Sequence, residues 1–141
     1  MSLKEIRMQL SEYFKVISTN DHVLHFELKN FWDKKFTEEL GATFFAEFKN
    51  AVDSFDKEKF IALADLSGFG VPSNEAKEYI GKGMKYALEN NLYKSVEIIP
   101  KTISKMGIDQ AAKKSVQDDF RVVSKDKSDA LRIVEDLKRE I

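Results

Sequence analysis

The chain has 141 residues, enough for one domain with its own hydrophobic core, and 43% hydrophobic with 33% charged residues excludes a disordered chain. A net charge of −1 excludes a general attraction to nucleic acid or to anionic membranes. The absence of cysteine excludes disulfides and thiolate chemistry, and it agrees with a cytoplasmic location. Apolar runs reach only about five residues, too few to span a bilayer. We therefore expect one soluble domain over residues 1–141.

The first part of the chain predicts a β-hairpin. Tyr13–Ser18 and His22–Lys29 flank the short polar turn Thr19-Asn20-Asp21. The second segment alternates apolar and polar residues, which is typical of a strand with one covered face near the edge of a sheet.

A helix is predicted from Asp33 to Val52, because apolar residues recur there every four positions. After it, Lys59–Leu66 is predicted as a buried central strand, since Phe60–Ala64 is apolar on both faces. The chain should then turn through Ser67–Pro72. The apolar stripe of the helix comprises Trp32, Phe36, Leu40, Phe44, Phe48 and Val52.

The second half of the chain continues to alternate between helices and strands. A helix is expected over Asn74–Glu89, ended by Asn90-Asn91, and a strand over Tyr93–Ile99. The remaining elements are a helix at Thr102–Lys114, a strand at Phe120–Ser124 and a helix capped by Asp126.

This order predicts an α/β fold with about five strands and four helices. Alternation of strand and helix after the hairpin requires crossover connections, so the sheet should be mainly parallel with an antiparallel edge hairpin.

Three short motifs resemble the STAS domain superfamily, specifically its SpoIIAA-like branch. They are Leu63–Ser67 with the following glycine loop and Ser73, the segment Phe31–Gly41, and Phe120–Ser124 together with Asp129–Leu131. The resemblance implies a non-catalytic regulatory or interaction domain that binds a protein partner. It also implies an alternative, because the branch shares its architecture with CRAL-TRIO lipid-transfer domains: a binder of a lipid or other apolar small ligand.

Ser73 occupies the approximate place where the resemblance implies a phosphorylated serine. The surrounding Val71–Glu75 lacks the acidic residue before the serine and the glycine after it. The favoured role of Ser73 is the N-cap of a helix, and a regulatory or partner-contacting role remains open beside it.

The partner site implied by the resemblance is the strand-to-helix turn, Ser67–Asn74. Asp65 lies at the carboxyl end of the central strand, where open parallel sheets build their sites. The favoured alternative for Asp65 is an acceptor for N–H groups of the turn. The candidate regulatory or partner residues are Asp65, Ser67, Ser73 and Asn74.

The chain contains 11 phenylalanines, most of which should fill the core between helix and sheet. Phe31, Trp32 and Phe45 lie at the start of the first predicted helix or off its stripe, so they could line an apolar pocket or form a homodimer patch.

No pattern predicts an enzyme, a cofactor or a metal site. Gly68-Phe69-Gly70 lacks the third glycine of a dinucleotide fingerprint, and no Gly-Lys-Ser/Thr follows it. His22 and His25, the only histidines, would point to opposite faces of one strand. Lysines are interleaved with acids and lack an accompanying aromatic row, so nucleic-acid binding is not expected.

Overall fold

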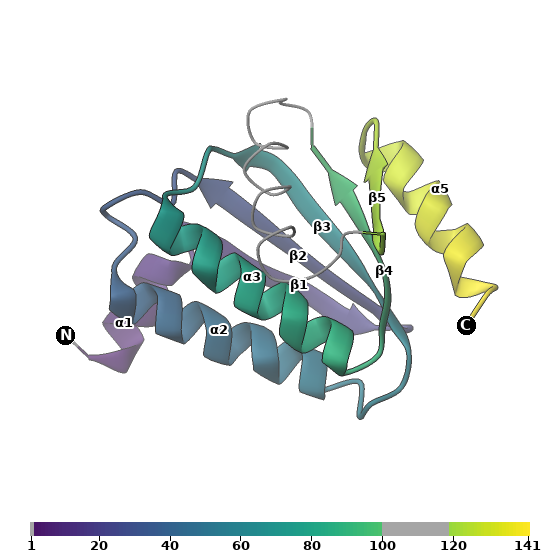
Figure 1. Cartoon of the computed structure of the whole chain (residues 1–141), viewed down its shortest axis with the longest axis horizontal. Coiled ribbons are helices and arrows are strands. Elements are labelled where there is room, and N and C mark those ends of the chain that lie inside the picture. Colours follow the sequence, from purple (N-terminus) through teal and green to yellow (C-terminus); the bar gives the residue numbers. More distant parts are fainter. Residues whose placement is uncertain (1, 100–118) are drawn as a thin grey trace.

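The computed structural model describes residues 2–99 and 119–141 of the chain. Within these ranges the protein is an α/β fold in which helices cover a five-stranded sheet (Figure 1). The strands follow the order of the sequence across the sheet, β1-β2-β3-β4-β5. β1 and β2 are antiparallel and the other neighbours are parallel, as the sequence predicts.

The strands are Phe14–Asn20 (β1), Val23–Asn30 (β2), Phe60–Phe69 (β3), Leu92–Ile98 (β4) and Arg121–Ser124 (β5). The helices are Leu3–Leu10 (α1), Glu38–Asp53 (α2), Asn74–Glu89 (α3) and Lys127–Lys138 (α5). The helix expected at Thr102–Lys114 lies outside the described residues.

The hairpin turn is shorter than expected and lies further along the chain, because β1 ends two residues later and β2 begins one residue later than predicted. Its two central residues are Asp21 and His22, which both have positive φ values, 54° and 62°. Such a backbone matches the twist of a two-residue hairpin. His22 is therefore a turn residue, and the prediction that it shares a strand with His25 was wrong.

The long helix begins at Glu38, not at Asp33 as predicted. Thr37 is its N-cap, with its side chain accepting the Leu40 N–H. Trp32 and Phe36 are nevertheless buried in the same core as the helical stripe, because the segment before the helix folds against that core. The four-residue spacing of apolar residues continues across the start of the helix, so spacing alone did not locate that start.

The N-terminal helix α1 was not predicted. Ser2 caps it by accepting the Glu5 N–H, and only Leu10 of its residues is buried. A helix with one buried side chain has a weak apolar pattern, which explains why the sequence did not reveal it.

Two apolar cores lie on opposite faces of the sheet. Even-numbered residues of β3, such as Phe60 and Ala62, pack with α2 and α3. Odd-numbered ones, such as Ile61 and Leu63, pack with Ala130 and Val134 of α5. The central strand is thus buried between helices, as its run of apolar residues predicted.

Candidate functional site

The candidate site lies where β2 and β3 end. β3 extends to Phe69, three residues beyond the predicted end, so Ser67 belongs to the strand and not to a turn. Backbone hydrogen bonds continue past the sheet: the Gly70 N–H donates to the Asn30 oxygen at 3.1 Å. The Ser73 N–H donates to the Trp32 oxygen at 2.8 Å. These bonds hold residues 30–32 beside residues 70–73.

Neighbouring aromatic residues point in opposite directions at this end of the sheet. Asn30 has a φ of 63°, a left-handed conformation that asparagine tolerates. Trp32 is fully buried, stacks on Phe36 with ring centroids 4.2 Å apart, and donates its Nε1–H to the Lys29 oxygen. Phe31 is 64% exposed.

The exposed Phe31 ring lies directly on the backbone of Gly70. A Cβ added to Gly70 would come within 2.3 Å of Phe31 Cδ1, so only glycine permits this approach. Val71, the next residue, is 39% exposed. The strand ends therefore present two adjacent apolar side chains to solvent, one of them supported from beneath.

Asp65 and Ser67 are bonded to each other. The Ser67 N–H donates to Asp65 Oδ1 at 3.0 Å, and the Ser67 hydroxyl donates to the same oxygen at 2.6 Å. Asp65 thus accepts an N–H of the following segment, the role that the sequence analysis favoured. It alternates with Ile61 and Leu63, which places it on the face of the sheet that α5 covers.

Ser73 is the N-cap of α3, as predicted. Its side chain accepts the Ala76 N–H at 3.2 Å, and α3 has the predicted bounds. Asn74 is exposed at the first position of the helix. The four predicted site residues thus lie in two separate places. Ser73 and Asn74 lie at the start of α3, where Ser73 lines a groove, whereas Asp65 and Ser67 lie on β3.

That groove has a volume of about 570 Å³ and lies between the segment Asp33–Glu38, which leads into α2, and the first half of α3. Phe36 and Tyr79 form its apolar part, with ring centroids 6.4 Å apart in an edge-on arrangement. Its polar lining comprises Asp33, Lys34, Thr37, Glu38, Ser73, Glu75, Glu78 and Lys82.

Phe31, Trp32 and Phe45 do not line a common cavity in the described structure. Trp32 is in the core, and Phe31 is exposed at the strand end. Phe45 is half-buried on α2 and packs edge-on against Tyr86 of α3.

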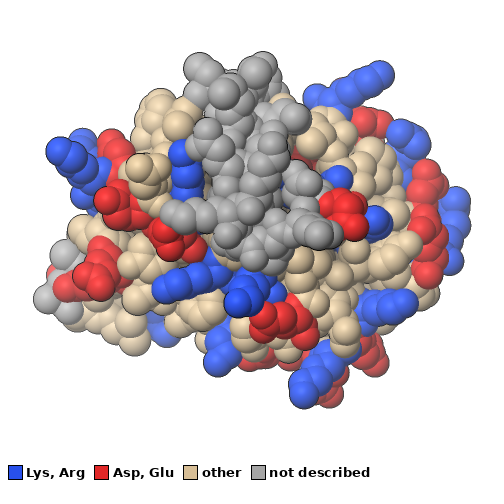
Figure 2. All heavy atoms as spheres, viewed as in Figure 1, with Lys and Arg blue, Asp and Glu red and all other residues tan. Residues whose placement is uncertain are grey.

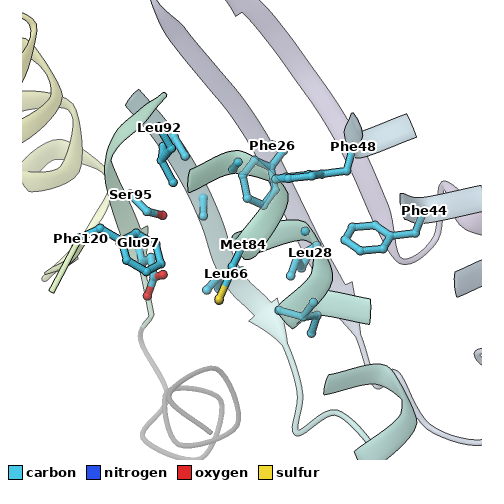
Figure 3. Close-up of a pocket in the computed structure, with 15 residues that line it drawn as sticks. Phe26, Leu28, Phe44, Phe48, Leu66, Met84, Leu92, Ser95, Glu97 and Phe120 are labelled. Carbon is cyan, nitrogen blue, oxygen red and sulfur yellow. The ribbon is translucent and has the colours of Figure 1, made fainter. Parts of the chain in front are cut away.

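A separate apolar cavity of about 50 Å³ lies between α3 and the sheet (Figure 3). Phe26, Phe48 and Met84 are among its apolar lining residues, and Ser95 and Glu97 of β4 reach it from one side. A volume of this size holds a few water molecules, whereas pockets for drug-sized ligands measure roughly 300–1,000 Å³.

Glu97 takes part in a buried ion pair that the sequence analysis missed. Arg121 of β5 donates to both carboxylate oxygens, at 2.6 and 2.8 Å, and both side chains are only 3% exposed. The Ser124 hydroxyl donates to the Glu97 backbone oxygen at 2.9 Å. A glutamate inside a strand that otherwise ends in apolar residues was the available signal.

Of the two histidines, His25 is the more buried, since His22 is exposed in the hairpin turn. It lies half-buried on β2, on the face that carries Asp65 and Glu27. Burial lowers the pKa of His25 below 6.5, and the positive charge of Lys127 lowers it further, against the opposing effect of the two carboxylates. Within residues 2–99 and 119–141 no cluster of three or more histidine and acidic side chains could hold a metal ion.

None of the helices in the described ranges has the length and apolar character needed to cross a membrane. Comparisons with family models, with curated proteins and with solved structures found no match to this chain.

Proposed function

We propose that this protein is a non-catalytic interaction domain of SpoIIAA/STAS-like type, and that it binds a protein partner at the end of β2 and β3. The contact surface comprises Phe31 and the segment Ser67–Asn74. The resemblance of the sequence motifs supports the type of domain.

The observation that carries this proposal is the exposed Phe31 ring held on Gly70 beside Val71. Large aromatic side chains at the centre of an interface supply much of its binding energy. A ring already supported by the backbone loses little conformational freedom when a partner covers it. Its position at the carboxyl ends of parallel strands is where open α/β sheets usually bind.

The proposal is tested by affinity capture from an extract of the source cells, with quantitative mass spectrometry. Phe31→Ala should remove the proteins that the unchanged chain enriches, because it deletes the anchor without disturbing the core. Leu131→Ala is the matched control, since Leu131 is an exposed apolar residue (46%) on α5. If Phe31→Ala and the unchanged chain enrich the same proteins, the proposal is wrong.

Binding of an apolar small ligand is the second candidate, supported by the apolar lining of the cavity beneath α3. Its volume of about 50 Å³ restricts the ligand to a small fragment unless the walls move. Native mass spectrometry of the purified protein tests this candidate: a bound small molecule supports it, and a spectrum of the bare chain after incubation with short fatty acids contradicts it.

A further inference from the structure

The groove between α2 and α3 adjoins the surface assigned above to a partner. Asp33 of the groove follows Phe31 by two residues, and Ser73 follows Val71 by two residues. The hydrogen bond from Ser73 to Trp32 holds the two segments together. A segment of a partner that covers Phe31 and Val71 can therefore continue into the groove.

The charge of the groove favours a positively charged occupant. Its lining contributes the carboxylates of Asp33, Glu38, Glu75 and Glu78 and the ammonium groups of Lys34 and Lys82. Figure 2 shows acidic and basic side chains mixed over the end of the molecule at which α2 and α3 begin, so the excess of negative charge belongs to the lining of the groove.

Two helices begin at the groove, yet their N-termini are poor anion sites. Thr37 and Ser73 already accept first-turn N–H groups, and the Ser73 N–H is bonded to Trp32. Glu38 and Glu75 place negative charge beside the positive ends of the helices. An anion entering the groove would meet these carboxylates.

The Tyr79 ring already carries a cation of the chain itself, because the ammonium of Lys82 lies 5.5 Å from its centroid, within the range of a cation–π contact. A cation of a partner would therefore bind at the carboxylates of the groove. The volume of about 570 Å³ accommodates a long side chain and its flanking backbone.

We propose that the groove binds a basic segment of the protein partner, with a lysine or arginine side chain placed between the carboxylates. This inference rests on the proposed function, because it assigns the chemistry of the partner that Phe31 anchors.

The test is selection of binders to the full chain from a phage-displayed library of random peptides. Selected peptides should be enriched in lysine and arginine over the unselected library. Their affinities are then measured by fluorescence polarisation at low and high salt. Binding should weaken as salt is raised, because the charges are close to the surface.

Matched charge variants make the test specific. Glu38→Gln/Glu75→Gln removes two carboxylates from the groove and should weaken binding about fivefold. Glu135→Gln/Asp136→Asn removes two carboxylates from α5, on the other face of the sheet, and should leave binding unchanged. Ser73→Asp keeps a capping oxygen, adds negative charge to the groove and should tighten binding about twofold.

The possible failures are distinguishable. If selected peptides require Phe31 but carry no excess of basic residues, or ignore Glu38→Gln/Glu75→Gln, the basic occupant is wrong and the proposed function stands. If no peptide depends on Phe31, the proposed function and this inference are both overturned.

Discussion

At the scale of single residues, the neighbours Phe31 and Trp32 show how one backbone conformation separates a surface role from a core role. Asn30 adopts a φ of 63°, after which Phe31 lies on Gly70 in solvent and Trp32 enters the core. From the sequence, these two aromatics were grouped with Phe45, because spacing alone cannot reveal a residue with left-handed backbone. The sequence did predict the roles of Asp65 and Ser73, because acceptor and cap chemistry depends on near neighbours in the chain.

Substitution of the two aromatic residues should affect stability very differently. Trp32→Ala removes a fully buried ring stacked on Phe36 and should lower the free energy of unfolding by about 3–5 kcal/mol. Phe31→Ala should change it by less than about 0.5 kcal/mol. Urea denaturation followed by circular dichroism measures both, and equal losses would contradict the assigned positions.

His25 should give the protein a stability that falls on mild acidification. Its pKa in the folded protein lies below 6.5, because burial and Lys127 disfavour the charged ring. The unfolded chain therefore takes up the proton more readily, and the free energy of unfolding decreases as the pH falls from above 6.5 towards the folded pKa.

The measurement is an NMR titration of the His25 ring, with a midpoint expected below 6.5. Lys127→Ala should raise that midpoint, and His25→Asn should flatten the pH dependence of stability in the same range. A midpoint at or above 6.5 in the unchanged protein would refute the prediction.

At the scale of elements, the boundaries that the sequence located well have local capping signals. Ser73 and the Asn90-Asn91 pair bound α3, and Asn91 adopts a φ of 76° that ends the helical region. The start of α2 was misplaced because Trp32 and Phe36 continue its apolar stripe from a segment that is not helical. The capping residue Thr37 was the better signal.

Loss of the α3 cap should weaken the protein measurably. Ser73→Ala removes the acceptor of the Ala76 N–H and should lower the free energy of unfolding by about 1 kcal/mol. Ser73→Asp supplies a carboxylate acceptor at the same place and should retain most of the stability. Denaturation of both variants under one condition makes the comparison, and an equal loss in both would show that capping is not the role.

At the scale of the whole molecule, the order of the strands follows the order of the sequence, so simple alternation was enough to predict the sheet. The antiparallel hairpin and the buried central strand followed from period-two and fully apolar patterns. The pairing of Glu97 with Arg121 could not be predicted, because it depends on the register of β4 and β5. That register sets Arg121 opposite Ser95, two residues before Glu97 on the same strand.

Removing one partner of this buried pair should destabilise the fold strongly. Arg121→Leu leaves the Glu97 carboxylate buried without the guanidinium and should lower the free energy of unfolding by roughly 3–5 kcal/mol at neutral pH.

Chemical denaturation at neutral pH checks this expectation. Glu97→Gln/Arg121→Leu serves as the comparison, since it removes both charges and should recover part of the stability of Arg121→Leu at neutral pH. If Arg121→Leu is as stable as the unchanged chain, the ion pair contributes little to stability.

The hydrogen bond between Ser73 and Trp32 ties the only tryptophan of the chain to the start of α3, so the fluorescence of Trp32 can report on the groove. The backbone oxygen of Trp32 accepts the N–H of Ser73, the N-cap of α3. Its indole stacks on Phe36, which also lines the groove. An occupant that shifts Phe36 or the start of α3 changes the surroundings of the sole indole, so intrinsic fluorescence can follow binding without a label.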